Sequence, residues 1–238
     1  MNQFEMTPSS AFETTTVRTA ERVTSFLKAV YGWMFVGLAT TAVVALAVVA
    51  SGFASVLLAN RLVFWGLAIG EIGLVFYLSA RVQKLAPGTA AALFLLYSAL
   101  NGATLSLIFL AFTGASIATT FVITAGMFGA LALFGATTKR SLAGVGHFVG
   151  MGLIGLILAM LVGMFWHNDG LQFVISIVGV IVFTGLTAWD SQRLKQMATA
   201  LPDGQVGSYA VVGALSLYLD FINLFLFLLR FFGGGRRD

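Results

Sequence analysis

The charged residues of this chain are few and stand in short groups, and the stretches between these groups are long and apolar. Residues 29–60, between Lys28 and Arg61, contain no charged side chain, and neither do residues 85–138, between Lys84 and Lys139. A helix needs about 20 mostly apolar residues to cross the hydrocarbon core of a bilayer. The first stretch therefore predicts one spanning helix and the second predicts two.

The composition excludes most soluble functions. Hydrophobic residues make up 59% of the 238 positions and charged residues only 9%, whereas soluble domains carry about 25% charged residues. A soluble catalytic or nucleic-acid-binding module is therefore excluded, and we expect no nucleic-acid partner. The net charge of +4 is typical of a membrane protein with basic loops. The absence of cysteine removes disulfides, thiolate nucleophiles and cysteine-based metal sites.

The pattern predicts an all-α fold, a polytopic membrane protein with seven spanning helices. These are expected over residues 29–50, 62–80, two segments within 85–138 that are separated at 111–116, and then 144–166, 171–189 and 209–229. Glycines at 144, 146, 150, 152 and 155 predict a helix that packs closely against a neighbour.

The chain divides into three parts. Residues 1–28 are expected to be a cytoplasmic segment, in which apolar positions from Val17 to Val30 recur at helical spacing and predict a short helix on the membrane surface. Residues 29–232 form the seven-helix domain, and residues 233–238 form a polar tail. With the N-terminus in the cytoplasm, most Lys and Arg residues lie on the cytoplasmic side, as the positive-inside rule requires.

The C-terminal arginines do not fit this orientation simply. A seventh full crossing places Arg230, Arg236 and Arg237 on the outer side, whereas a re-entrant last helix returns them to the cytoplasm. The sequence is consistent with both arrangements.

Among the ionisable side chains within or at the ends of the predicted spans, four stand out: Glu71, Arg81, Asp190 and Asp220. Such a group costs about 2.5 to 3.5 kcal/mol at the centre of a bilayer and indicates a functional site by default. Arg81 and Asp190 end their spans on the same side, where each could also be a simple interfacial residue. Asp220 has apolar neighbours on all sides, so its carboxyl group needs a partner or a proton.

Three motifs resemble those of the Bax inhibitor-1 family. They are Ala188-Trp-Asp-Ser-Gln-Arg-Leu-Lys195, Gly135-Ala-Thr-Thr-Lys-Arg140 and Leu215-Ser-Leu-Tyr-Leu-Asp-Phe-Ile-Asn-Leu-Phe-Leu-Phe-Leu-Leu-Arg230. The resemblance covers about residues 17–230. It implies six helices around a central seventh, and a pH-sensitive calcium leak. It also implies that Asp190 and Asp220 are a sensing pair latched by Arg81. Trp189 departs from the pattern, because many relatives have tyrosine there.

Two carboxylates in a low dielectric share a proton and titrate as one coupled unit, so protonation of the aspartate pair can act as a switch. The oxygen atoms of Glu71, Asn101 and Asn223, with Arg230 nearby, are a candidate ion pathway beside the pair. Calcium takes 6 to 8 oxygen ligands, and these residues form no dense cage. We therefore expect at most a weak calcium site at Asp190 and Asp220, no other cofactor, and calcium as the permeant ion.

Two other functions are alternatives to the calcium leak. An intramembrane aspartyl protease also uses two aspartates on neighbouring helices, but its second aspartate follows Gly-x-Gly, whereas Asp220 follows Leu217-Tyr-Leu219. We therefore expect no enzyme activity. The resemblance to bacterial relatives supports a second hypothesis, a regulator that binds a membrane-anchored ATP-dependent protease. In either case the expected location is the bacterial inner membrane, and the expected partners are the lipid bilayer and calcium.

Overall fold

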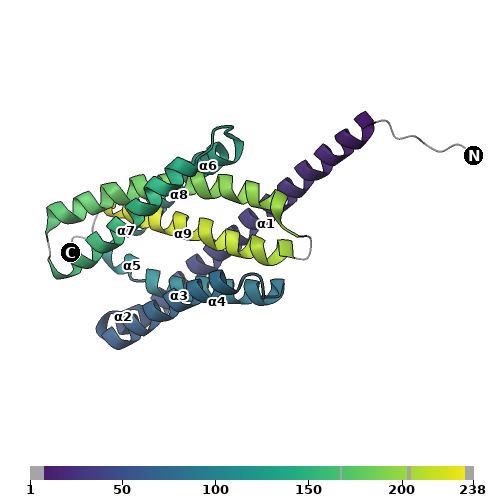
Figure 1. The fold of residues 1–238 in the computed structure, drawn as a ribbon. Helices are drawn as coiled ribbons and strands as arrows, with labels where there is room; N and C mark the ends of the chain where they lie inside the picture. Colours follow the sequence, from purple (N-terminus) through teal and green to yellow (C-terminus); the bar gives the residue numbers. More distant parts are fainter. Residues whose placement is uncertain (1–7, 167, 203–204, 234–238) are drawn as a thin grey trace, which may run out of the picture.

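The computed structural model describes the backbone of residues 8–166, 168–202 and 205–233, and side chains from Arg18 onward. The first residues of the expected cytoplasmic segment (1–7) and most of the expected tail (234–238) lie outside this range. The described residues form helices joined by short connections (Figure 1). In chain order they are α1 (Pro8–Ala50), α2 (Phe53–Ala59), α3 (Arg61–Arg81), α4 (Pro87–Leu105), α5 (Ile108–Ala111), α6 (Gly114–Thr137), α7 (Ala143–Phe165), α8 (Asp169–Ala200) and α9 (Val206–Phe232).

The prediction of an all-α membrane protein with seven spans is confirmed. Within the described residues, seven helical segments are long and apolar enough to cross a bilayer: Arg18–Ala50, Arg61–Arg81, Pro87–Ala111, Gly114–Thr137, Ala143–Phe165, Asp169–Ala200 and Val206–Phe232. Each contains or overlaps one predicted span. The break expected at 111–116 is the connection between α5 and α6, where Thr113 caps α6 by accepting a hydrogen bond from the Ser116 amide.

The structure differs from the sequence prediction at the start of α1. The short helix expected on the membrane surface continues into the first span without a break, because no proline interrupts the sequence between Pro8 and Ala50. Phe26, Val30 and Met34 lie on one face of this helix and are buried. The N-terminal part of α1 extends beyond the rest of the bundle in Figure 1.

The structure also differs at the end of the sixth span, which was expected at Trp189. α8 continues to Ala200, and the Leu201 amide closes the helix by donating to the Met197 carbonyl. The polar sequence after Asp190 is amphipathic, because Leu194 and Ala198 are buried while Arg193 and Lys195 are exposed. Asp190 therefore lies inside a long helix, with three further turns between it and the helix end.

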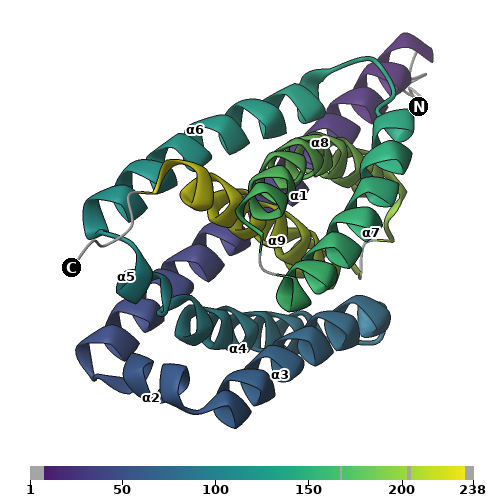
Figure 2. The same cartoon turned by 90° about the vertical axis from the view of Figure 1, so that its left-hand side faces the viewer.

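The last helix lies at the centre of the bundle, as expected. α9 contacts α1, α3, α4, α6 and α8, and Figure 2 shows it surrounded by other helices. Leu217, Tyr218 and Leu224 are completely buried. A helix that is apolar on all sides is buried on all sides, and the interior position of α9 follows from this property.

α9 is one unbroken helix of 27 residues, about 40 Å long. Near its start, Gly213 packs against Leu194 in the last part of α8. Near its end, the ring of Phe231 packs against Phe173 in the first part of α8, with 5.2 Å between centroids. The two helices are therefore antiparallel along their whole length, and the structure favours a full crossing over a re-entrant last helix.

The glycine-rich helix α7 packs closely against α8, as predicted. A Cβ atom on Gly146 would overlap the Trp189 ring, and one on Gly152 would touch Val182. On the other side of α8, Gly135 of α6 lies against the main-chain carbonyl of Ala188. These contacts fix α8 on both sides of the segment that carries Asp190.

Candidate functional site

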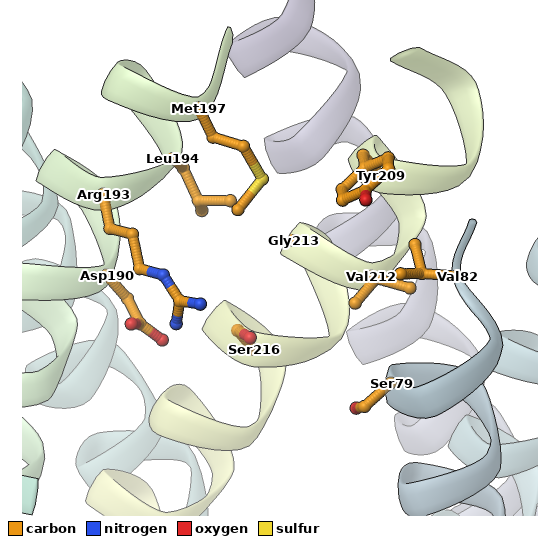
Figure 3. Close-up of a pocket in the computed structure, with 10 residues that line it drawn as sticks. All are labelled: Ser79, Val82, Asp190, Arg193, Leu194, Met197, Tyr209, Val212, Gly213 and Ser216. Carbon is orange, nitrogen blue, oxygen red and sulfur yellow. The ribbon is translucent and has the colours of Figure 1, made fainter. Parts of the chain in front are cut away.

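A cavity of about 250 Å³ lies where α3, α8 and α9 meet. Its polar lining residues are Ser79 of α3, Asp190 and Arg193 of α8, and Tyr209 and Ser216 of α9. Figure 3 shows the side chains of Asp190 and Arg193 pointing from α8 toward Ser216 on the facing helix. The cavity therefore brings one predicted site residue, Asp190, together with polar groups that were not predicted.

Asp220 lies one helical turn beyond Ser216 along α9. Its side chain is 5% exposed, and its Oδ2 atom is buried without a hydrogen-bond partner among the described residues. It interacts electrostatically with Asp190. The structure thus brings together the two aspartates proposed as a pair, one half-buried beside the cavity and one fully buried behind it.

The cation beside the aspartates is Arg193. It stands one turn after Asp190 on α8, interacts with it electrostatically, and its guanidinium group lies beside the Asp190 carboxylate in Figure 3. The same guanidinium group lies over the Trp189 ring, 5.3 Å from its centroid. The aromatic residue that departs from the family pattern therefore helps to position this arginine.

Arg81, the predicted latch, lies at the end of α3 and is exposed. Its guanidinium group is over the Tyr77 ring of its own helix, 6.0 Å from the centroid. Its neighbours Ser79 and Val82 line the cavity, but Arg81 does not. The structure does not bring Arg81 together with the aspartates, and its role as a latch stays a prediction.

Glu71 belongs to a second polar cluster, between α3 and α4. Its Oε2 atom accepts a hydrogen bond from the Asn101 amide at 3.1 Å, and its Oε1 atom accepts one from the Thr104 hydroxyl at 2.5 Å. The sequence singled out Glu71 and Asn101 separately but did not predict that they bond to each other. Glu71 is 8% exposed and Asn101 9%, so this is an interior cluster.

Tyr218 and Thr41 extend the Glu71 cluster across the bundle. The Tyr218 hydroxyl of α9 donates to Asn101 Oδ1 at 3.0 Å and lies 2.6 Å from the Thr41 hydroxyl of α1. Tyr218 is completely buried, and the rings of Phe94 and Tyr97 pack edge-on against it. Sequence reasoning missed both hydroxyls. The only signal was that Tyr218 stands two residues before Asp220 in an otherwise apolar helix.

The other two residues of the candidate pathway lie apart from these clusters. The Asn223 side chain is half-buried, and its amide donates to the Leu219 carbonyl of the same helix at 2.8 Å. Arg230 is exposed near the end of α9, over the Phe227 ring, beside a separate cavity that Asp169 and Gln172 of α8 also line. These contacts do not join Asn223 or Arg230 to Glu71, and the role of the three residues in an ion pathway stays a prediction.

The aspartate site has few ligands for a divalent cation. Asp190 and Ser216, with Ser79 opposite, present oxygen atoms to the cavity. Within the described residues, no three Asp, Glu or His side chains gather as a metal site. Because calcium prefers 6 to 8 oxygen ligands, this donor set suits a weakly held, partly hydrated ion.

A central apolar helix that carries a buried aspartate, paired with an aspartate on its neighbour, defines a polytopic membrane protein with an ionisable interior. Such interior groups mark ion or proton pathways in membrane proteins. Residues 23–237 match the family model described as "Inhibitor of apoptosis-promoting Bax1". The chain belongs to the Bax inhibitor-1 family.

Bacterial relatives cover almost the whole chain. The "Inner membrane protein YbhL" of Escherichia coli strain K12 is 50% identical over 216 residues, which cover 89% of this chain and 92% of the relative. An uncharacterized protein of Borreliella burgdorferi is 46% identical, with 90% of this chain and 93% of the relative covered. An uncharacterized protein of Rickettsia prowazekii, RP147, is 37% identical, with 92% of each chain covered. These relatives and the seven spans identify an integral membrane protein of the bacterial inner membrane.

Proposed function

We propose that this protein is a calcium leak pathway that responds to pH through the proton shared by Asp190 and Asp220. The observation that carries the proposal is the buried Oδ2 atom of Asp220, which has no hydrogen-bond partner in the described structure, close to a second carboxylate. An isolated ionised carboxylate is very costly in such surroundings. A proton shared by the two carboxyl groups lowers the cost of burying them. When this proton is released, the two negative charges attract a divalent cation.

The cavity supports the same proposal. It lies between α3, α8 and α9 and is lined by Asp190. In this proposal, the charges of the aspartates and Arg193 control the relative positions of α8 and α9. Protonation weakens the pairing of Asp190 with Arg193 and lets α8 and α9 separate. Arg81 would act in this scheme only after a movement of the end of α3, since it is now exposed.

The test is calcium flux into liposomes that contain the purified protein and a calcium-sensitive dye. We expect flux above that of empty liposomes, and a rate that increases as the pH is lowered. Liposomes that pass no more calcium than empty ones at any pH would refute the leak. Liposomes with Asp169→Asn are a matched control, because Asp169 is exposed and lies in the first turn of α8, far from the pair.

The same assay separates the leak from the second function inferred from the family resemblance. Modulation of a membrane-anchored protease needs that partner, whereas a leak appears in liposomes that contain this chain alone. The proposal assigns no enzyme activity and no resident cofactor to the chain. The cytoplasmic location of the N-terminus also stays a proposal, supported by the basic residues Arg18, Arg22 and Lys28 near the start of α1.

A further inference from the structure

The hydrogen bonds from Glu71 to Thr41 form a chain, and the donor and the acceptor of each bond follow from the protons that each group carries. With Glu71 ionised, its two oxygens accept from the Asn101 amide and the Thr104 hydroxyl. The Asn101 oxygen must then accept, and the Tyr218 hydroxyl donates to it. The Thr41 hydroxyl is left with a choice of acceptors, since it lies 2.6 Å from the Tyr218 oxygen, 2.9 Å from the Ser98 carbonyl and 3.0 Å from the Gly37 carbonyl.

A second arrangement satisfies the same atoms when Glu71 carries a proton. When the proton is on the Oε2 atom, the Asn101 amide nitrogen cannot accept a hydrogen bond from it, so the amide group turns over and presents its oxygen to the Glu71 hydroxyl. Its nitrogen then donates to the Tyr218 oxygen, Tyr218 donates to Thr41, and Thr41 donates to the Ser98 carbonyl. The two amide orientations have nearly the same shape, and in both arrangements each hydroxyl group of the chain has an acceptor.

The charged groups near Glu71 do not fix it in the ionised form. α3 packs against α2, α4 and α9, and α2 and α4 contain no charged residue. The titratable groups that face Glu71 are the phenols of Tyr97 on α4, which lines the same cavity, and of Tyr218 on α9. Asp220 of α9 interacts with Asp190, and Arg230 lies over Phe227.

The two arginines of α3 are also distant from Glu71. Arg61 and Arg81 stand ten residues away at the two ends of this helix, about 15 Å along its axis. Glu71 therefore has two hydrogen bonds in its ionised form, but no Lys, Arg or His side chain pairs with it in the part of the chain that the structure describes. A cavity of about 390 Å³, lined by Glu71, Tyr97 and Leu219 among others, lies beside the carboxyl group.

We infer that Glu71 is a proton-binding site separate from the aspartate pair, and that one proton bound there reverses the hydrogen bonds of Asn101, Tyr218 and Thr41. The proton stays on the Glu71 carboxyl group, and only the donor and acceptor roles along the chain change. Tyr218 is the link to the aspartates, because it stands two residues before Asp220 on the central helix. This inference goes beyond the calcium leak and does not depend on it.

Infrared difference spectra of the purified protein during a pH titration test the inference. Glutamate labelled with ¹³C separates the glutamate bands from those of aspartate. The chain has glutamate at positions 5, 13, 21 and 71, so a variant with E5Q, E13Q and E21Q leaves Glu71 as the only glutamate. We expect this protein to show one labelled carboxylic-acid band on acidification, and a change in a tyrosine band in the same step.

Variants assign the tyrosine signal. Tyr218→Phe keeps the ring packed against Phe94 and Tyr97 but should abolish the change, whereas Tyr31→Phe, at a separate cavity between α1 and α6, should retain it. Asp220→Asn should leave the labelled glutamate band in place. No labelled carboxylic-acid band at any pH at which the protein is folded would overturn the inference, and so would a tyrosine band that does not change with it. The infrared titration involves no calcium. A negative infrared result therefore does not refute the calcium leak, and a negative flux result does not affect the interpretation of the infrared spectra.

Discussion

Replacing either aspartate of the pair by asparagine is expected to remove most of the pH response of the calcium leak. Asp220→Asn and Asp190→Asn keep the side-chain volume and part of the hydrogen bonding, but the group can no longer gain or lose charge. In each single variant the remaining carboxyl group has no second carboxylate with which to share a proton. The double variant is therefore expected to behave like the single ones.

The size of the effect follows from the interaction between two charges. Two unit charges about 4 Å apart interact by about 4 kcal/mol at an effective dielectric constant of about 20. Even a third of this energy, about 1.4 kcal/mol, is a tenfold change in a protonation equilibrium. Asp220 is 5% exposed and interacts with Asp190, so we expect the ratio of acidic to alkaline flux to fall at least about tenfold in each single variant.

The assay compares four proteins in dye-loaded liposomes over one pH series: the wild type, the two single variants and the double variant. Residues that act as a unit show interaction energies of about 0.5 to 3 kcal/mol in such a cycle, whereas independent sites add within about 0.5 kcal/mol. Asp169→Asn, an exposed acid on the same helix as Asp190, should leave the profile unchanged. If the effects of the two single variants add, the carboxylates do not share a proton and the reasoning fails.

Three further predictions concern Arg193, Arg81 and the packing of α6 against α8. Arg193→Ala should change the pH at which the leak responds, because Arg193 lies beside Asp190. Arg81→Ala should change it only if Arg81 moves from its exposed position on Tyr77, and an unchanged profile would reduce Arg81 to an interfacial anchor. Gly135→Ala should destabilise the protein by about 1 to 3 kcal/mol, measured as thermal unfolding in detergent, because the new Cβ would overlap the Ala188 carbonyl. Gly129→Ala on the same helix, with nothing near the new Cβ, should be neutral or stabilising, and equal losses in both variants would contradict the packing argument.

The number of spans, their approximate limits and the central position of α9 could be predicted from the sequence and the family resemblance. Uncharged apolar segments long enough to cross a bilayer form helices there, because a helix makes all its main-chain hydrogen bonds internally, without water. The limits of α1 and α8 were predicted too short for a different reason. Around Phe26 and Leu194 the sequence changes from uniformly apolar to amphipathic, but the helix continues, because the apolar face of each of these segments packs on the bundle.

The side-chain contacts of the site were less predictable. The pairing of Asp190 with Asp220 came from the family pattern, and the structure brings these two together. The position of Arg193 could have been read from its spacing, because residues three apart on a helix are neighbours. By contrast, the bond of Tyr218 to Asn101 depends on how α9 is rotated between α1 and α4, and no local pattern in a uniformly apolar helix fixes that rotation.

The rotation of α9 connects the two polar clusters. Residues two apart on a helix point about 200° away from each other, so Tyr218 and Asp220 project to nearly opposite sides. Tyr218 meets Asn101 and Thr41 on α4 and α1, while Asp220 meets Asp190 on α8. The hydrogen bonds of Tyr218 hold α9 in this rotation, together with its packing contacts, and so keep Asp220 toward its partner. A change of charge on either side of α9 therefore acts on a single rigid element, and the proton equilibria of Glu71 and of the aspartate pair should influence each other through it.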